Sequence, residues 1–175
     1  MAKYVGSISK SRMLGVDFLM IFVMLGTQDK SFKRLLDYVE QSKIQEEIIV
    51  QAGYTKFESD KMQIYDYLSS EQFDEFIKQA DLIITHGGVG SIMSALKRGK
   101  KVIACARLEK YMEHQNDHQK QIIESFALEG YLLELNEHNS LDELYNRCIH
   151  FTPKKVKSNN KVFVEKLENY LEEVL

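Results

Sequence analysis

The sequence predicts an α/β fold, with a mostly parallel, Rossmann-like sheet and helices on both of its faces. The first observation is that short apolar runs alternate with amphipathic helical patterns along the chain. The second is that two of these runs end in a loop of small residues directly before a helix, near residues 26–31 and 86–91. The third is the composition, since 44% hydrophobic and 28% charged residues are typical of a globular protein.

Each expected strand is an apolar run bounded by polar or turn-forming residues. These runs cover residues 20–25, 47–52, 62–68, 82–84, 101–106 and 131–135. The helical patterns between them cover residues 31–42, 69–80, 91–99 and 117–129, one from 140 onward and one over 163–171. Ser69 with Gln72, and Ser140 with Glu143, have the spacing of capping boxes.

The composition also excludes several classes of protein. A net charge of -3 in 175 residues gives no indication of nucleic-acid binding. Cys105 and Cys148 have no metal-site spacing, and Cys105 lies in an apolar run, so we expect buried, reduced thiols and a cytoplasmic protein. No apolar run approaches the length of a membrane span.

The first nineteen residues differ from the rest of the chain. They have no clear periodicity and precede Met20, which resembles a second start, so we interpret residues 1–19 as an expression leader. A signal peptide is the alternative, but no small-residue cleavage site follows the apolar run. Residues 20–175 are then expected to form a single domain.

The central motif spans residues 81–99. An apolar strand leads into the glycine-rich segment 86–90, which is expected to end the strand, and Ser91 is the expected N-cap of a helix that stops at Gly99. The first turn of a helix offers unpaired N–H groups and a partial positive charge, so a diphosphate is a natural guest. The spacing matches neither a P-loop nor G-x-G-x-x-G, and a plain turn without ligand is the alternative.

A second loop of small residues follows the first strand, at Gly26 and Thr27. Because the carboxyl ends of parallel strands meet at one edge of the sheet, this loop and the glycine loop are expected to face one crevice.

The polar segment 107–119 carries further candidates. His114 and His118 are four residues apart, but the Glu of the zinc-protease motif is missing and no third ligand is obvious, so a metal site is disfavoured. Gln119 and His118, with Asn116 and Glu113, suit a sugar or nucleotide, although a helix cap explains them as well. Arg107 is placed to bind a phosphate, or alternatively a surface carboxylate.

Three segments taken together resemble a known family. They are MIFVMLGTQ from Met20, THGGVGS from Thr85, and RLEKYMEHQNDHQ from Arg107. The set resembles the C-terminal domain of glycosyltransferase family 28, over about residues 20–150. It is most similar to the PssE type of bacterial polysaccharide glycosyltransferase subunit. It is also similar to the catalytic subunit of the eukaryotic two-subunit transferase that adds the second GlcNAc to dolichol-linked sugar.

The resemblance implies the donor-binding half of a GT-B glycosyltransferase, which holds a UDP-sugar as substrate without a metal or other cofactor. Three groups of residues match the family's donor site. They are the first loop (Gly26, Thr27, Gln28), the loop facing the diphosphate (His86, Gly87, Gly88, Gly90, Ser91) and the pair reading the sugar (His118, Gln119), with Arg107 as an added charge. The family commonly has Glu three residues after the loop serine for the ribose hydroxyls, whereas this chain has Ser94.

The resemblance also implies a partner and a pathway. The acceptor-binding half is expected to be a membrane-associated PssD-type subunit, which would hold this chain at the inner face of the plasma membrane. The acceptor is expected to be a sugar on undecaprenyl diphosphate, and the product an exopolysaccharide or capsule unit. An inverting transfer needs a base, for which Glu113 and His114 are local candidates unless the partner supplies it.

Two other functions remain open. One is a non-catalytic subunit that binds a nucleotide-sugar, which predicts UDP binding without transfer. The other is a stand-alone UDP-sugar epimerase or hydrolase, which predicts turnover by this chain alone.

Overall fold

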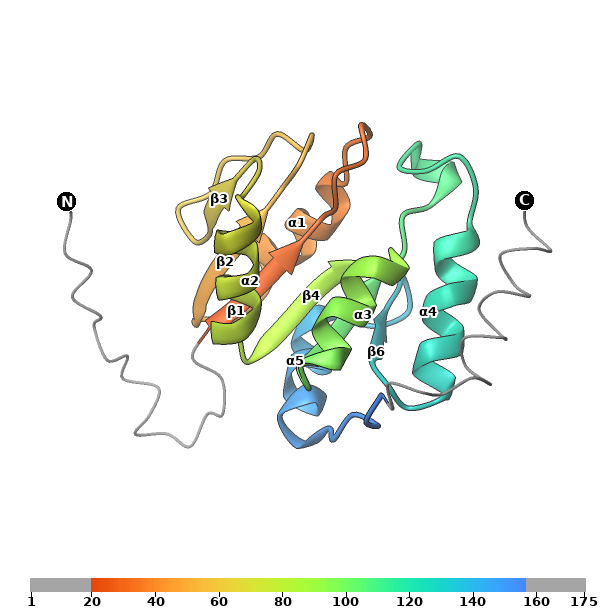
Figure 1. Cartoon of the computed structure of the whole chain (residues 1–175). Coiled ribbons are helices and arrows are strands. Elements are labelled where there is room, and N and C mark those ends of the chain that lie inside the picture. The colour runs from red at the N-terminus through yellow and green to blue at the C-terminus, as the bar shows by residue number, and fades with distance from the viewer. Residues whose placement is uncertain (1–19, 157–175) are drawn as a thin grey trace.

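The computed structural model describes residues 20–156, which form a three-layer α/β/α domain around one sheet (Figure 1). Six strands pair in the order β3-β2-β1-β4-β5-β6, and every pairing is parallel. The expected α/β, Rossmann-like fold is therefore confirmed. The expected leader, residues 1–19, and the expected closing helix, residues 163–171, lie outside the described residues.

The elements follow each other in regular alternation. The strands are β1 (Met20–Met24), β2 (Glu47–Gln51), β3 (Gln63–Tyr65), β4 (Leu82–His86), β5 (Lys101–Cys105) and β6 (Leu133–Leu135). The helices are α1 (Lys33–Gln41), α2 (Ser70–Gln79), α3 (Val89–Lys97), α4 (His118–Leu128) and α5 (Leu141–His150), with a short 3₁₀ turn, η2 (Glu109–Tyr111).

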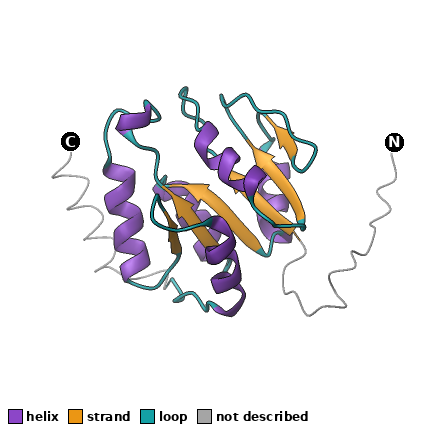
Figure 2. Cartoon of the chain, turned by 180° about the vertical axis from the view of Figure 1, so that it is seen from behind, coloured by secondary structure: helices purple, strands orange, loops and turns teal. Residues whose placement is uncertain are grey.

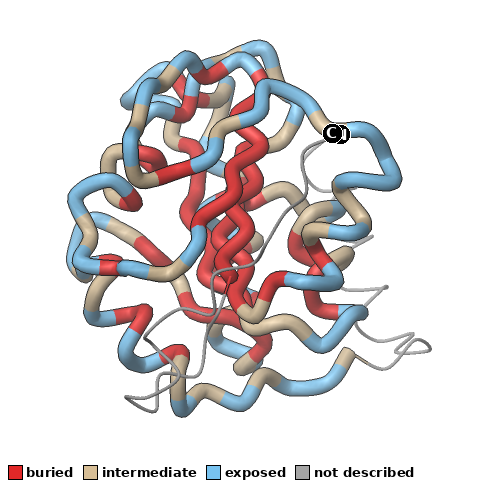
Figure 3. Tube along the Cα trace, turned by 90° about the vertical axis from the view of Figure 1, so that its left-hand side faces the viewer, coloured by how far each residue is buried: buried red, intermediate tan, exposed pale blue. Residues whose placement is uncertain are grey.

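The sheet is buried on both faces because each central strand supplies apolar side chains to both. In β1, Ile21 and Val23 point into one core, whereas Phe22 and Met24 point into the other. Helices α1 and α5 cover the first face, and α2, α3 and α4 cover the second, as the views from the front and from behind show (Figures 1 and 2). The buried strands form the centre of the molecule (Figure 3).

The strand order places a topological switch point between β1 and β4. From β1 the chain winds outward through β2 and β3, then returns to pair β4 with the other side of β1. At such a point the loops after the two neighbouring strands diverge and leave a crevice at the carboxyl ends, where ligands bind in α/β proteins. The two loops of small residues follow β1 and β4, so both lie at this crevice, as the sequence predicted.

The structure corrects two expectations at the glycine loop. His86 continues β4, because it pairs with Cys105 of β5. Helix α3 begins at Val89, with Gly88 as its N-cap, so Ser91 lies inside the first turn and is not the cap. The reason is backbone geometry, since Gly88 is extended and its carbonyl already accepts the first helical hydrogen bond, from Ile92 N–H.

Candidate functional site

A cavity of about 570 Å³ opens at the switch point between β1 and β4. Six of the residues expected from the sequence line it: Gly26, Thr27, His86, Gly88, Gly90 and Ser91. The other lining residues were not among those that the sequence predicted for a site, and they include Gln51, Leu68, Ser70, Phe73 and Asp74. The cavity has the size, the polar loops and the apolar walls of a small-molecule site.

His86 is wedged between the two loops. A Cβ atom added at Gly26 would lie 2.7 Å from its Nε2 atom, and one at Gly88 only 2.3 Å from the same atom. Both positions must therefore be glycine for the imidazole to fit. Gly26 also has a φ of +80°, which a residue with a side chain rarely adopts.

The imidazole of His86 is neutral in the folded chain. Burial, with added repulsion from the nearby Arg107 guanidinium, lowers its pKa from 6.5 to about 4. Its Nδ1 atom lies 3.4 Å from the carbonyl oxygen of Met24, which can only accept a hydrogen bond. The Thr85 hydroxyl also lies 3.4 Å from Nδ1 but already donates to the same carbonyl at 3.2 Å, so we assign the proton to Nδ1, which leaves Nε2 unprotonated beside the two glycines.

The N-terminus of α3 gives the cavity an anion-binding edge. The N–H groups of Val89, Gly90 and Ser91 fall in the first turn, where no helical carbonyl precedes them to accept their hydrogen bonds. Nothing lies within 4 Å of a Cβ built at Gly90, so the space beside this turn is open. A diphosphate placed there would meet several N–H donors and the positive end of the helix dipole.

Gln119 holds the glycine loop from outside the cavity. It is 8% exposed, and its Oε1 atom accepts hydrogen bonds from the N–H groups of Gly87 at 3.0 Å and Arg107 at 3.1 Å. A Cβ at Gly87 would lie 2.5 Å from the Cβ of Gln119, so the loop packs directly on this side chain. In the structure, Gln119 therefore does not line the cavity but orients the loop that does.

Arg107 is committed to backbone carbonyls in the interior. It is 1% exposed, and its guanidinium donates to the carbonyl oxygens of Leu25 at 2.8 Å and Lys30 at 2.7 Å. Burial lowers its pKa to about 10, against the opposing effect of Glu113. Arg107 does not line the cavity, and its guanidinium ties the first loop to the segment after β5.

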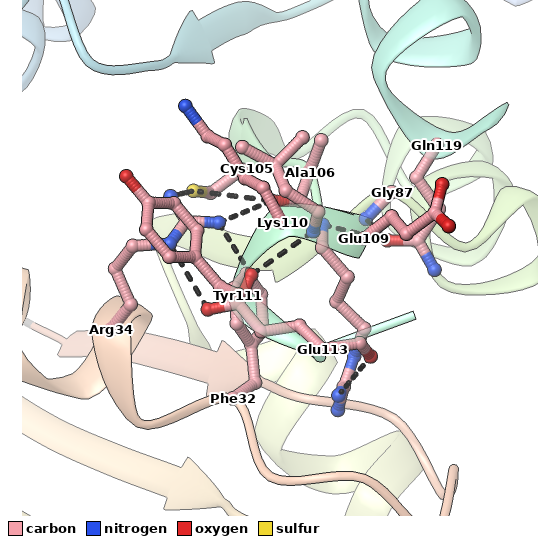
Figure 4. A network of polar contacts seen from close by, with 12 residues as sticks. Phe32, Arg34, Gly87, Cys105, Ala106, Glu109, Lys110, Tyr111, Glu113 and Gln119 are labelled. Carbon is pink, nitrogen blue, oxygen red and sulfur yellow. Dashed lines mark hydrogen bonds and ion pairs between the residues drawn. The ribbon is translucent and has the colours of Figure 1, made fainter. Parts of the chain in front are cut away.

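Glu113, an expected candidate base, forms a buried ion pair with Arg34 of α1 (Figure 4). Its carboxylate oxygens lie 3.0 Å from Nε and 2.7 Å from Nη2 of Arg34, and Oε2 also accepts from Leu108 N–H. Burial is the largest single effect on Arg34 and opposes its charge, but the hydrogen bond and the charge of Glu113, together with smaller effects of Cys105 and Tyr38, raise the pKa of Arg34 above its usual value. This two-point pair suits a structural role better than proton abstraction.

Four other expected residues do not line the cavity. These are Gln28, Gly87, His114 and His118. The Nδ1 atom of His114 accepts from Asn116 N–H at 3.3 Å, and the N–H of His118 donates to the Asn116 side chain. Within residues 20–156, no three His, Cys, Asp or Glu side chains come together as metal ligands.

Sequence reasoning missed Arg34, Asp74 and the other cavity residues on α2. Arg34 and Glu113 are 79 positions apart, so no local spacing relates them. The sequence pattern of α2 indicated only a capped amphipathic helix before the central strand, and nothing in it pointed to a ligand.

Comparison with known proteins agrees with this geometry. The sequence profile described as glycosyltransferase family 28 C-terminal domain matches residues 20–174. The mouse protein "UDP-N-acetylglucosamine transferase subunit ALG13" is 36% identical over 75 residues, which are 43% of this chain, and the human protein of the same name matches equally. The match covers only 6% of the length of either relative.

Solved structures show the same fold at low sequence identity. An NMR structure of ALG13 matches with a TM-score of 0.58 and 19% identity, over 85% of this chain and 94% of that one. The glycosyltransferase of kitacinnamycin also has a TM-score of 0.58, at 15% identity, over 89% of this chain and 38% of that one. The calicheamicin glycosyltransferase CalG4 has a TM-score of 0.56 at 12% identity, over 90% of this chain and 38% of that one.

Proposed function

The chain belongs to the family of the glycosyltransferase family 28 C-terminal domain, and from that membership we propose that it binds the UDP-sugar donor of a hexosyltransferase. The observation that carries this proposal is the 570 Å³ cavity, which both small-residue loops and the first turn of α3 enclose at the switch point. A nucleotide diphosphate fits the chemistry of that cavity because its negative charge meets unpaired N–H groups.

The same cavity supports a mechanism for the departing UDP. Sugar transfer leaves negative charge on the β-phosphate, and the N–H groups at Val89, Gly90 and Ser91 are oriented to stabilise it without reorganisation. The open space at Gly90 lets the phosphate approach the backbone. Gln119, Arg107 and the Arg34–Glu113 pair hold the loops in place and need not touch the ligand.

We further propose that the chain is the catalytic subunit of a two-component inverting enzyme. Support comes from the similarity to a relative named as a transferase subunit. The partner would be a membrane-associated PssD-type acceptor-binding subunit that holds the chain at the inner face of the plasma membrane. Within residues 20–156 no helix is long and apolar enough to cross a bilayer, so this chain's described part would reach the membrane through that partner.

The acceptor and pathway in this proposal follow the PssE-type resemblance. The chain would transfer a hexose to a sugar on undecaprenyl diphosphate, in exopolysaccharide or capsule biosynthesis. We place the base on the partner, because Glu113 is engaged by Arg34 and lies outside the cavity wall. His114 is the remaining local candidate.

Calorimetric titration tests donor binding. We expect the purified chain to bind UDP and a subset of UDP-sugars, and Gly88→Asp to abolish binding, because a side chain at Gly88 displaces His86 and adds negative charge beside the phosphates. Gly130→Asp is the matched control. It introduces the same side chain where nothing lies within 4 Å, and the strain of its φ of +80° is smallest for Asp and Asn among residues with a side chain, so any loss of stability there is separate from the site.

The outcome also separates the other functions. Transfer of the sugar only after the acceptor-binding subunit is added supports the two-component enzyme. UDP binding without transfer in the complex would indicate a non-catalytic subunit, and consumption of UDP-sugar by this chain alone would indicate an epimerase or hydrolase. Absence of UDP binding at millimolar ligand would contradict the proposal.

A further inference from the structure

We infer that the carboxylate of Asp74 binds the ribose hydroxyls of the nucleotide, so that the site selects a ribonucleoside over a 2′-deoxyribonucleoside diphosphate. This inference rests on the proposed function, because it concerns the same cavity. It assigns a specificity-determining residue on α2, a helix that contains none of the residues expected to bind the donor.

The position of Asp74 is the first argument. Ser70 and Asp74 are four residues apart on α2, so they share one face of the helix, and both line the cavity. Gly90 and Ser91 of α3 line the same cavity. Helices α2 and α3 lie on the same face of the sheet (Figure 1), which brings the carboxylate and the anion-binding turn into one site.

The carboxylate is held in place from outside the cavity. Arg98, which directly follows α3, donates from Nη2 to Oδ1 of Asp74 at 2.8 Å. The other terminal nitrogen of Arg98 donates to the carbonyl and the hydroxyl of Ser94, at 3.0 and 2.9 Å, which orients the guanidinium. The Asp74 side chain is half-exposed, and Arg98 engages one of its carboxylate oxygens, whereas Oδ2 has no hydrogen-bond partner among the described residues and is left to accept from a ligand.

The negative charge of Asp74 determines which part of the ligand can lie next to it. A carboxylate accepts hydrogen bonds and repels phosphate, so the phosphates face the first turn of α3 and a hydroxyl-bearing group faces Asp74. The ribose is joined to the first phosphate through its 5′ oxygen, and its 2′ and 3′ hydroxyls are neighbouring donors that one carboxylate can bind. Carboxylates bind the ribose hydroxyls of dinucleotides in the same manner in other α/β proteins.

The surroundings of Asp74 favour the ribose over the transferred hexose. Leu68 and Phe73 also line the cavity and give it apolar surface, which suits the planar base that is attached to a ribose. Ser94 is not placed to take this role, since it does not line the cavity and its hydroxyl accepts from Arg98.

The test is calorimetric titration of the whole chain with UDP and with 2′-deoxyuridine diphosphate. We expect the wild type to prefer UDP by about tenfold, because the lost hydroxyl forms a hydrogen bond to a charged group, and Asp74→Asn to reduce this preference to about twofold. Glu75→Gln is the matched control, since it removes a neighbouring exposed carboxylate on α2 that does not line the cavity.

A second variant separates ligand binding from the ion pair. Arg98→Met removes the partner of Asp74 but leaves the carboxylate in the cavity, so the preference for UDP should stay above about fivefold. If Arg98→Met lowered the preference as much as Asp74→Asn, the ion pair and not the carboxylate would account for the effect, and the inference would be overturned.

The remaining outcomes distinguish this inference from the proposed function. Donor binding stands if the wild type binds UDP and Gly88→Asp does not. If, in addition, wild type and Asp74→Asn show the same ratio between the affinities for UDP and for 2′-deoxyuridine diphosphate, the ribose assignment is wrong. The same holds if Asp74→Asn changes the choice between UDP-hexoses and leaves the ribose preference intact. If the wild type does not bind UDP at all, both fail.

Discussion

Gln119 and Gly87 are joined by a 3.0 Å hydrogen bond from the glycine N–H to the Oε1 atom of the glutamine. The two residues are 32 positions apart, and the bond connects the start of α4 to the loop between β4 and α3. The same oxygen accepts from Arg107 N–H, so one buried side chain satisfies two backbone donors. The orientation of the glycine loop therefore depends on a residue outside the cavity.

Replacing Gln119 tests this relationship. Gln119→Leu leaves the N–H groups of Gly87 and Arg107 buried without an acceptor, which we expect to cost about 2 kcal/mol of the free energy of unfolding. Hydrogen exchange should speed up at both amides, and UDP affinity should fall by about tenfold as the loop loses its support. Gln119→Glu keeps an acceptor and should preserve the protection of both amides. Unchanged exchange in the leucine variant would contradict the proposed support.

Breaking the Arg34–Glu113 pair should destabilise the fold. The Glu113 side chain is only 6% exposed, so Glu113→Gln and Arg34→Met should each lower the free energy of unfolding by about 3 kcal/mol, measured in urea. The double variant should lose clearly less than the sum of the two single losses, because neither charge is then left unpaired.

The exposed pair Lys56–Asp66 is the control for this measurement. Its side chains are 79% and 56% exposed, so Lys56→Met should change stability by less than about 0.5 kcal/mol. UDP affinity in Glu113→Gln should stay within about threefold of the wild type if the residue only positions the loop. A loss of sugar transfer in a Glu113→Gln variant with normal UDP affinity would instead indicate that Glu113 is the base.

The neutral His86 should make stability depend on pH. The unfolded chain protonates this residue near pH 6.5, whereas the folded chain does so only near pH 4, so between these values the unfolded state binds more protons. Its stabilising contribution is complete above pH 6.5 and declines as the pH falls toward 4, by about 3 kcal/mol in total.

A comparison of wild type with His86→Gln isolates this effect. The difference between their free energies of unfolding should shrink as the pH falls from about 7 to 4, while the carboxylates common to both proteins cancel. A difference that is constant over this range would show that His86 titrates normally in the folded chain.

The cysteines should react only when the chain unfolds. Cys105 and Cys148 are 1% and 0% exposed, and burial is the main cause that raises the pKa of each thiol to about 12. We expect no reaction with an aromatic disulfide reagent at pH 8 in native buffer, and two thiols per chain in denaturant. Rapid reaction of the native protein would contradict the burial of Cys105 in β5 and of Cys148 in α5.

The sequence alone determined the order of strands and helices and the location of the glycine loop. Apolar runs, helical periodicity and capping residues are local features, and they predicted the parallel α/β fold and six cavity residues, Gly26, Thr27, His86, Gly88, Gly90 and Ser91. They also predicted the capping box at Ser69 and Gln72, which both partners form. These local features predicted the start of α3 less accurately. The N-cap is the extended Gly88 and the helix begins at Val89, whereas the sequence pattern predicted Ser91 as the cap.

Only the tertiary structure decided which polar side chains face the cavity and which support it. Arg107 points to the carbonyls of the first loop, Glu113 pairs with Arg34, and Asp74 enters the cavity from α2. None of these contacts follows from spacing along the chain, because each joins segments that the sheet order brings together across the switch point. Burial then decides their chemistry, since a charge removed from water must find a partner within the folded protein.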